Sequence, residues 1–309
     1  MKLKSITSAI FVTVFIAGTT IFAAPLPELQ FKNLVSFGDS FTDSGNVYKL
    51  TNQTWPSPAN FYEGRFSNGK MWVEYLGEIF GAELENKAYG GATSDNDLVQ
   101  GIISKLVVPG ATEDIPVPGI KQQVDEYLLE NNDHGNTLYA FWDAGNDYFF
   151  TNFTVEPSKV VESMGLSFEK LATAGAKSFL VADIEDFSLL PFFKDLSSEI
   201  KTSYKAIVKA HNDALGDYLK SFAEQHNDVN IYRFTTVEIF AYYMSDKGQE
   251  ELKITNVIDA CNTIYSNLTN PVICEDPEQF FFWDAFHVTT KINSAIAKDC
   301  VKLFQRIDN

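Results

Sequence analysis

The chain is poor in the residues on which metal centres, disulfide scaffolds and nucleic-acid interfaces depend. Its 309 residues include three cysteines and four histidines, and no CxxC pair or Cys/His spacing typical of a zinc site occurs. Lysine and arginine number 24 against 41 aspartates and glutamates, which gives a net charge of −17. A surface this acidic repels phosphate backbones, so we expect no nucleic-acid partner. The G-x-S-x-G motif is also missing, which argues against the nucleophile elbow of ordinary α/β-hydrolases.

Long apolar runs are absent except at the start of the chain. Residues 1–23 combine the basic start MKLK with the apolar stretch AIFVTVFIAGTTIFA, and small residues follow at Ala23 and Ala24. This layout is typical of a secretory signal peptide, whereas the alternative, a membrane anchor, needs about 20 apolar residues. We therefore expect a signal peptide over residues 1–23, a secreted protein and no stable membrane insertion. Residues 24–309 contain no linker or repeat and are expected to form a single domain.

In a secreted protein, cysteines can form disulfides and some asparagines can carry N-glycans. Cys261 and Cys274 flank a polar loop and are the preferred disulfide pair, which leaves Cys300 over. The alternative is that all three thiols are free and buried. Three Asn-x-Thr sequons are candidate N-glycan acceptors, provided that the cell glycosylates and the sites are exposed: Asn52, Asn152 and Asn267.

Strand-like and helix-like patterns alternate along most of the chain. Strands are expected at 33–37, 82–89, 137–144, 176–184 and 229–234, and helices at 71–81, 119–131, 155–175, 197–226 and 289–307. This alternation predicts an α/β protein with a parallel sheet covered on both faces. Ligands of such sheets bind beyond the carboxyl ends of the strands. The Pro/Gly-rich stretch 107–119 is predicted to be a loop on that rim, either shaping a substrate cleft or simply lying at the surface.

Residues suited to acyl transfer occur in four stretches near the predicted strand ends and before the last helix. Such a site needs a nucleophilic hydroxyl, a histidine to take its proton and a carboxylate to orient the histidine. Ser40 offers the hydroxyl, His287 the base and Asp284 the carboxylate. The backbone N–H groups of Ser40 and Gly91 and the side-chain amide of Asn146 are candidate donors to an oxyanion. The four stretches are FGDSFTDSGN, NKAYGGATS, AGNDY and WDAFH.

Each of these residues also has an ordinary structural interpretation. Ser40 could cap a helix, Asp284 and His287 could be a chance local pair, and Gly91 and Asn146 could serve turns. All four coincidences would be needed together, so the combination favours catalysis. The remaining histidines lie in polar or helical surroundings and are expected at the surface: His134, His211 and His226.

In this order along the chain, the four stretches resemble the GDSL, or SGNH, hydrolase family. GRFSNGKMWVEYLG at 64–77 is similar to the branch that holds plant GDSL esterases, fungal acetylesterases and some secreted bacterial lipases. The resemblance implies a three-layer α/β/α sandwich with a flavodoxin-like parallel sheet, and ester hydrolysis without metal or organic cofactor. It carries over the nucleophile to Ser40, the acid and base to Asp284 and His287, and oxyanion donors to Gly91 and Asn146.

Two departures from the family pattern leave this chemistry intact. Phe41 stands where the GDSL consensus has leucine, and Val288 where relatives often have proline. Supporting roles are expected for residues around the motifs, namely Asp39 at the Ser40 turn and Arg65, Asn68 and Trp72 in the first crossover. Trp283 is expected to pack in the core, with a place beside the Asp284–His287 pair as the alternative.

The resemblance implies a secreted serine ester hydrolase with an acyl-enzyme on Ser40. Short-chain or acetyl esters are the expected substrates, with plant-wall saccharide esters as one candidate. A lipase, phospholipase or acyltransferase acting on longer acyl chains is the alternative, and a catalytically inactive glycan- or lipid-binding relative is the non-enzyme alternative. The expected partner is a small-molecule or saccharide ester, and the protein is expected to be a monomer.

Overall fold

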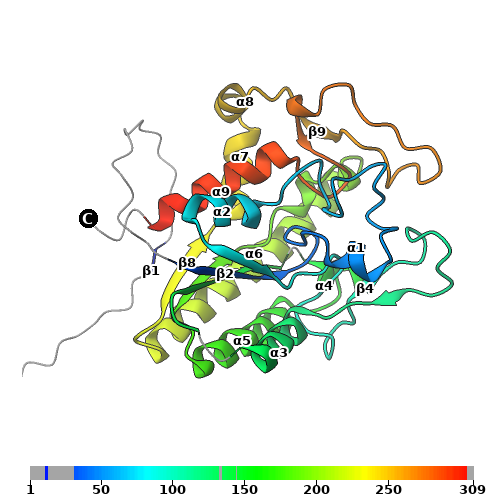
Figure 1. The fold of residues 1–309 in the computed structure, drawn as a ribbon. Helices are drawn as coiled ribbons and strands as arrows, with labels where there is room; N and C mark the ends of the chain where they lie inside the picture. The colour runs from blue at the N-terminus through cyan, green and yellow to red at the C-terminus, as the bar shows by residue number, and fades with distance from the viewer. Residues whose placement is uncertain (1–10, 13–30, 132–133, 144, 305–309) are drawn as a thin grey trace, which may run out of the picture.

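A sheet of parallel strands forms the middle layer of the molecule (Figure 1). The computed structural model describes residues 11–12, 31–131, 134–143 and 145–304. The predicted signal peptide therefore lies outside the described residues, except for the two-residue strand β1. The strands of the main sheet are β1 (Phe11–Val12), β2 (Asn33–Gly38), β3 (Glu83–Asn86), β6 (Thr137–Trp142), β7 (Ser178–Ala182) and β8 (Asn230–Phe234).

The strand order is β1-β8-β7-β6-β2-β3, and every neighbouring pair is parallel. Apart from β1, the five strands follow the order 2-1-3-4-5, which is the flavodoxin-like doubly wound arrangement. In this order the chain reverses direction across the sheet next to β2. The carboxyl ends of β2 and β6 therefore border a crevice that can hold a ligand.

Helices cover both faces of the sheet because its strands are apolar on both sides. Within β6, Leu138 and Ala140 belong to one core cluster, while Tyr139 and Phe141 belong to the other. The first face is covered by α2 (Trp72–Phe80), α7 (Thr236–Met244) and α9 (Thr290–Phe304). The second face is covered by α3 (Ile120–Glu130), α5 (Pro157–Ala174) and α6 (Ser198–Gln225). Figure 1 shows α2 and α9 above the sheet and α3 and α5 below it. The predicted three-layer α/β/α fold is confirmed.

The predicted strands and helices all have counterparts within a few residues of their expected ends. Shorter elements were not anticipated: α1 (Asn46–Leu50), α4 (Asn146–Phe150), α8 (Asp246–Leu252), η1 (Phe187–Leu189), η2 (Pro191–Phe193) and η3 (Pro277–Gln279). Two small sheets were also missed, the antiparallel pair β4 (Ile102–Ile103) and β5 (Ile115–Pro116), and the parallel pair β9 (Asn256–Ala260) and β10 (Phe280–Phe282). The predicted loop 107–119 thus contains a short strand.

The prediction that three histidines lie at the surface is wrong for two of them. His211 is completely buried in α6, and its Nδ1 makes a 2.8 Å hydrogen bond with the Tyr148 hydroxyl. Burial lowers the pKa of His211 to about 3, because charging the ring there would strip it of water. His134 is also buried, while His226 is partly exposed and contacts Glu169.

The cysteines and sequons have definite places in the fold. Cys261 and Cys274 are joined by a disulfide, and Cys300 is a buried free thiol. The three sequon asparagines, Asn52, Asn152 and Asn267, are exposed, so glycosylation stays a prediction that the fold permits. Across the described ranges, no helix combines the length and apolarity needed to cross a bilayer.

Candidate active site

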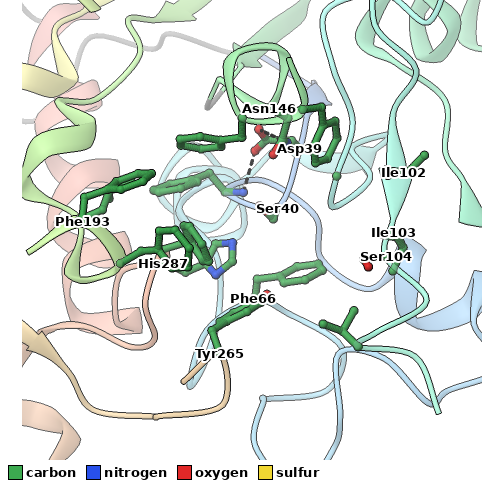
Figure 2. A pocket seen from close by; sticks show the side chains of 18 of the residues that line it. Asp39, Ser40, Phe66, Ile102, Ile103, Ser104, Asn146, Phe193, Tyr265 and His287 are labelled. Carbon is green, nitrogen blue, oxygen red and sulfur yellow. Dashed lines mark hydrogen bonds between the residues drawn. The ribbon is translucent and has the colours of Figure 1, made fainter. Parts of the chain in front are cut away.

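A cavity of about 530 Å³ opens where the C-terminal ends of β2 and β6 meet the loops that carry the motif residues. Ser40, Gly91, Asn146 and His287 all line it, although they are distributed over almost 250 positions of the chain. Figure 2 shows Ser40 between His287 and the Asp39–Asn146 pair. Asp284 lies behind His287 and is completely buried. The five residues proposed from sequence are therefore gathered at one place.

The turn after β2 presents Ser40 to this cavity. Gly38 has φ +154°, and a Cβ there would lie 2.4 Å from the carbonyl oxygen of Trp142, so only glycine fits. Gln123 holds the same residue from α3, accepting from its N–H at 3.0 Å and donating to its carbonyl at 2.9 Å. Ser40 follows two residues later and is half-buried. The turn that carries Ser40, the candidate nucleophile, is therefore fixed by Trp142 of β6 and by Gln123 of α3.

Asp39 connects this turn to α4. Its Oδ1 accepts a 3.0 Å hydrogen bond from the backbone N–H of Phe41, and its Oδ2 accepts one of 3.0 Å from Asn146 Nδ2. The Asp39 side chain is completely buried. The expected role of Asp39 in holding the Ser40 turn is consistent with these contacts, which also orient Asn146.

Asp284 and His287 form a close pair. His287 Nδ1 lies 2.9 and 2.8 Å from the two carboxylate oxygens of Asp284. Asp284 Oδ1 also accepts hydrogen bonds from the backbone N–H groups of Phe286 and His287. With its Nδ1 proton directed at a carboxylate, the neutral ring leaves Nε2 free to accept a proton. This is the arrangement that a general base requires.

Aromatic rings hold the imidazole in position. The rings of Phe66 and Phe41 have centroids 5.2 and 5.6 Å from that of His287, and Tyr265 lies on another side at 6.3 Å. His287 is 5 % exposed. Within the described part of the chain, Ser40 Oγ makes no hydrogen bond with His287. A general-base role for His287 would therefore need a contact with Ser40 that tightens when substrate binds, as is common in unliganded enzymes.

The three candidate oxyanion donors differ in whether they already bind an acceptor. Among the described residues, no acceptor is bonded to the backbone N–H of Ser40 or of Gly91. Asn146 Nδ2, in contrast, donates to Asp39 Oδ2 and also to the carbonyl of Ala92 at 2.8 Å. Both amide hydrogens of Asn146 are thus engaged, and Asn146 must exchange one of these bonds to reach an oxyanion.

Gly91 is held against the β4 strand in a way that admits no side chain. Its φ is +78°, and a Cβ would lie 2.1 Å from the carbonyl oxygen of Ile102. Ile102 N–H donates to the carbonyl of Gly91 at 3.1 Å, which fixes the peptide unit on this side. Gly91 itself lines the cavity.

Asp43, the second aspartate of the FGDSFTDSGN stretch, connects this stretch to NKAYGGATS by a hydrogen bond. It accepts hydrogen bonds from the N–H groups of Gly45 (2.7 Å), Asn46 (2.6 Å) and Val47 (3.1 Å) at the start of α1. It also accepts one of 2.9 Å from Gly90, next to Gly91. Burial raises the pKa of Asp43, while these four hydrogen bonds oppose the rise. Sequence reasoning did not single out this residue.

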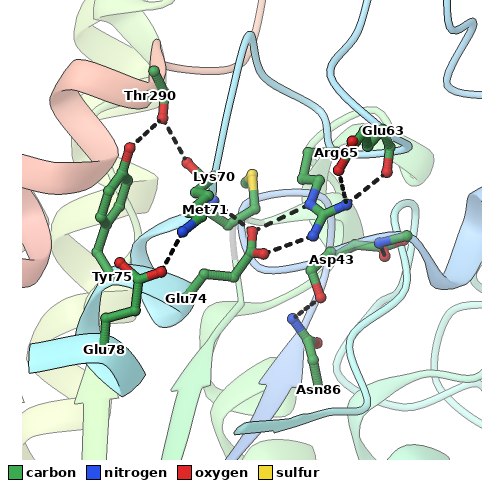
Figure 3. A network of polar contacts seen from close by, with 12 residues as sticks. Asp43, Glu63, Arg65, Lys70, Met71, Glu74, Tyr75, Glu78, Asn86 and Thr290 are labelled. Carbon is green, nitrogen blue, oxygen red and sulfur yellow. Dashed lines mark hydrogen bonds and ion pairs between the residues drawn. The ribbon is translucent and has the colours of Figure 1, made fainter. Parts of the chain in front are cut away.

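The GRFSNGKMW stretch braces the first crossover (Figure 3). Arg65 pairs with Glu74 through two hydrogen bonds of 3.2 and 2.7 Å, and Glu74 accepts from the N–H of Met71 at the start of α2. Asn68 Oδ1 accepts from the N–H of Thr290 at 2.8 Å, so it caps α9, the helix that follows His287. The stretch therefore links the beginning of the domain to its last helix.

Two further features of the cavity were not anticipated from the sequence. Aromatic and aliphatic side chains form most of one wall, from α4 through η2 to the loop before α9: Phe149, Phe150, Phe153, Leu190, Phe192, Phe193, Tyr204, Tyr265 and Phe286. Glu185, which is completely buried, also lines the cavity. The sequence held a signal for both features, because Glu185 directly follows the predicted strand 176–184 and the apolar run FSLLPFF comes after it.

In the part of the chain that the structure describes, no group of His, Cys, Asp or Glu side chains is arranged to hold a metal ion.

Comparison with known proteins identifies the family. A family model described as GDSL-like Lipase/Acylhydrolase matches residues 34–300. The chain belongs to this family. Curated proteins to which the chain is similar include a thermolabile hemolysin of Vibrio parahaemolyticus (28 % identity, 89 % of this chain), a phosphatidylcholine-sterol acyltransferase of Aeromonas hydrophila (25 %, 62 %) and an acetylesterase of Hypocrea jecorina (26 %, 62 %). The chain spans 64 %, 56 % and 59 % of the lengths of these relatives.

Proposed function

We propose that this GDSL protein is a serine-dependent carboxylic ester hydrolase that forms an acyl-enzyme on Ser40. One observation carries the proposal. Ser40 shares a cavity with His287, whose Nδ1 is bound by the buried Asp284, and with two backbone N–H groups that have no acceptor in the described chain. A nucleophile, a base with its orienting carboxylate and donors for an oxyanion are the parts that acyl transfer requires.

In the proposed mechanism, Ser40 Oγ attacks the ester carbonyl while His287 Nε2 takes the hydroxyl proton. Asp284 holds the ring in the required tautomer and stabilises the imidazolium. The N–H groups of Ser40 and Gly91, with the amide of Asn146, bind the developing oxyanion. The tetrahedral intermediate then collapses, and His287 gives its proton to the departing alcohol. Water attacks the acyl-enzyme by the same route, which releases the carboxylic acid and restores Ser40.

The substrate that the cavity fits best is an ester with a sizeable apolar acyl group. The wall formed by α4, η2 and the loop before α9 is almost entirely aromatic or aliphatic, and Phe192 there is 56 % exposed. Burial of apolar surface against such a wall contributes about 25 cal/mol per Å², so each additional buried methylene favours binding. The cavity volume of about 530 Å³ is also within the usual range of roughly 300–1,000 Å³ for small-molecule sites. The relative named a phosphatidylcholine-sterol acyltransferase supports this direction.

Short-chain or acetyl esters, including esters of plant-wall saccharides, are the second candidate. The acetylesterase among the relatives favours them, as does the motif stretch at 64–77. An acetyl group would leave most of the aromatic wall without contact. Acyl transfer to an alcohol other than water uses the same acyl-enzyme and is part of the same proposal.

The secreted character of the protein belongs to this proposal. Residues 1–23 act as a signal peptide, and residues 24–309 form one extracellular hydrolase domain that works as a monomer on a small-molecule or saccharide ester. The sequons at Asn52, Asn152 and Asn267 are exposed, which supports glycosylation on this route.

Active-site variants test the chemistry. With a chromogenic ester, we expect Ser40→Ala and His287→Ala to lower kcat by at least about 10³-fold, as for other triads. Ser44→Ala is the matched control, because Ser44 lies four residues away in the same motif and does not line the cavity. A serine-directed organophosphate should label Ser40. Near wild-type rates in the Ser40 and His287 variants, or labelling at Ser44, would refute the mechanism.

A series of nitrophenyl esters from acetate to palmitate tests the substrate. We expect kcat/KM to rise with acyl length beyond acetate, and Phe153→Ala to reduce this rise by removing a ring from the apolar wall. Leu129→Ala serves as the control, because Leu129 is 86 % exposed and lies on α3 away from the cavity. A maximum at acetate, unchanged by Phe153→Ala, would favour the short-chain candidate.

A further inference from the structure

Three buried acids follow the ends of three neighbouring strands. Asp39 follows β2, Asp143 follows β6 and Glu185 follows β7, and these strands are adjacent in the order β7-β6-β2. Their exposed fractions are 0 %, 1 % and 0 %. The carboxyl groups are therefore gathered at one edge of the sheet, and two of them, Asp39 and Glu185, line the cavity.

The three carboxyl groups are not equally supplied with hydrogen bonds. Asp39 accepts one at each oxygen, from Phe41 N–H and Asn146 Nδ2. Asp143 accepts one from Gly145 N–H at Oδ1, while its Oδ2 has no partner in the described chain. Neither oxygen of Glu185 makes a well-formed hydrogen bond among the described residues; the donors beside it are its own backbone N–H and the indole N–H of Trp142. A buried carboxylate with so few donors is costly, so Glu185 is the group of the three least able to carry a charge.

The charges around Glu185 act in the same direction. Burial raises the pKa of Glu185 most, and the nearby Asp39 after β2 and Asp186 on its own segment raise it further, while hydrogen bonds from its own backbone and from the Trp142 side chain oppose the rise. Burial likewise raises the pKa of Asp143, which follows β6, with Asp147 of α4 adding to the effect. Among the described residues that line the cavity, His287 is the only histidine and none is a lysine or an arginine. Burial, the neighbouring acids and the lack of a well-formed hydrogen bond therefore all favour the neutral form of Glu185.

Glu185 lies where the catalytic residues meet the apolar wall. It shares the cavity lining with Ser40 and Asp39, and its own segment continues into Leu190, Phe192 and Phe193. Hydrophobic residues of this segment, including Phe187, pack into the core behind it. An acyl chain that extends from Ser40 along this wall would share the cavity with Glu185.

We propose that Glu185 is a specificity-determining residue, which must be neutral for the cavity to accept an apolar acyl group. This inference rests on the proposed ester hydrolysis at Ser40. A neutral carboxyl group can lie against an acyl chain at modest cost. A carboxylate at the same place would draw water toward a group that no water reaches in the free protein. It would also repel Asp39, the residue that orients Asn146.

The proposal predicts an alkaline limit that depends on the acyl group. For a long-chain ester, kcat/KM of the wild type should fall about tenfold per pH unit above the pKa of Glu185. The fall should be much smaller for the acetate ester, which leaves the wall empty. In Glu185→Gln, which keeps the shape but cannot ionise, the long-chain profile should follow the acetate profile when each is scaled to its own value at pH 7.

Asp195→Asn is the matched control, because Asp195 is an exposed acid on the same segment and does not line the cavity. It should keep the wild-type profile with both esters. An independent readout is the infrared band of a protonated carboxyl group, which should be present at neutral pH in the wild type and weaker in Glu185→Gln.

Several outcomes would overturn the proposal. They are superimposable alkaline profiles of the wild type and Glu185→Gln with the long-chain ester, an equal fall with both esters in the wild type, or an unchanged carboxyl band in Glu185→Gln. If the variant does not fold, the ratio of the two wild-type profiles still decides. Failure of the Ser40 mechanism is distinct, because Ser40→Ala would then stay active, whereas failure of this inference leaves Ser40→Ala inactive.

Discussion

Asp43 accepts a 2.9 Å hydrogen bond from the backbone N–H of Gly90, a residue 47 positions further along the chain. The same carboxylate binds the start of α1. The turn that carries Ser40 and the loop that carries Gly91 are therefore held by one buried side chain. The distance between the nucleophile and a candidate oxyanion donor depends on a residue that touches neither the substrate nor the base.

Replacement of Asp43 should affect both stability and turnover. Asp43→Ala leaves four backbone N–H groups without their acceptor, and each buried unpaired donor costs about 1–3 kcal/mol. We expect a loss of at least about 3 kcal/mol in the free energy of unfolding, measured with urea, together with a lower kcat. Asp97→Ala, with a side chain 79 % exposed, should change stability by less than about 0.5 kcal/mol. Equal stability of the two variants would contradict this role.

Gly91 and Gly110 allow steric exclusion to be separated from backbone strain. Their φ angles are +78° and +80°, but a Cβ would meet Ile102 O at 2.1 Å in the first case and nothing within 4 Å in the second. Both alanine variants should lose about 1–2 kcal/mol of stability through the left-handed backbone. Gly91→Ala alone should also lose at least about 100-fold in kcat, because the peptide that carries the oxyanion donor must shift. Similar kcat values would show that the Gly91 N–H takes no part.

Replacement of Asn146 should change kcat rather than KM. Its amide hydrogens bind Asp39 and Ala92 O in the free protein, and one of them must move to the oxyanion during reaction. Asn146→Ala should therefore lower kcat by about 10²–10³-fold with little change in KM. Steady-state kinetics with one ester at fixed pH measures both constants. A raised KM with unchanged kcat would assign Asn146 to substrate binding instead.

His211 should make the protein sensitive to acid. Its pKa is about 3 in the folded state, below the ordinary value of about 6.5 in the unfolded chain, so the unfolded state binds the proton first. Stability from this residue is complete above pH 6.5 and is lost as the pH falls toward 3, by about 1.4 kcal/mol per unit. Urea unfolding between pH 6 and 4 should show a shallower slope for His211→Asn than for the wild type. The matched control is His226→Asn, at a partly exposed histidine, and parallel curves for wild type and His211→Asn would contradict the prediction.

The fold could be predicted because the main strands are buried on both faces and are therefore apolar along most of their length. The stretch at 33–37 and the one at 137–144 are nearly continuous apolar runs, which is typical of central parallel strands. The short elements were missed for the opposite reason. β4 and β5 have two residues each and owe their existence to contacts with each other and with Gly91, which no local pattern records.

The candidate site was predictable where chemistry needs rare residue types together, as at Asp284 and His287. The burial of His211 had a signal that was not used, because it lies three residues after Val208 and four before Leu215 on the apolar face of α6. The position of Glu185 after the strand at 176–184 was a signal for its place in the cavity, but its burial beside Asp39 and Trp142 depends on the neighbouring strands and could not be predicted.

Hydrogen bonds from the Thr290 N–H to Asn68 Oδ1 and from the Trp72 N–H to Asn293 Oδ1 join α2 and the stretch before it to α9. Ser40 stands near one end of the chain and His287 near the other, so no contiguous fragment holds the catalytic set. During synthesis, Ser40 leaves the ribosome almost 250 residues before His287 does. If the two residues act as proposed, ester hydrolysis is the last property that a nascent copy acquires.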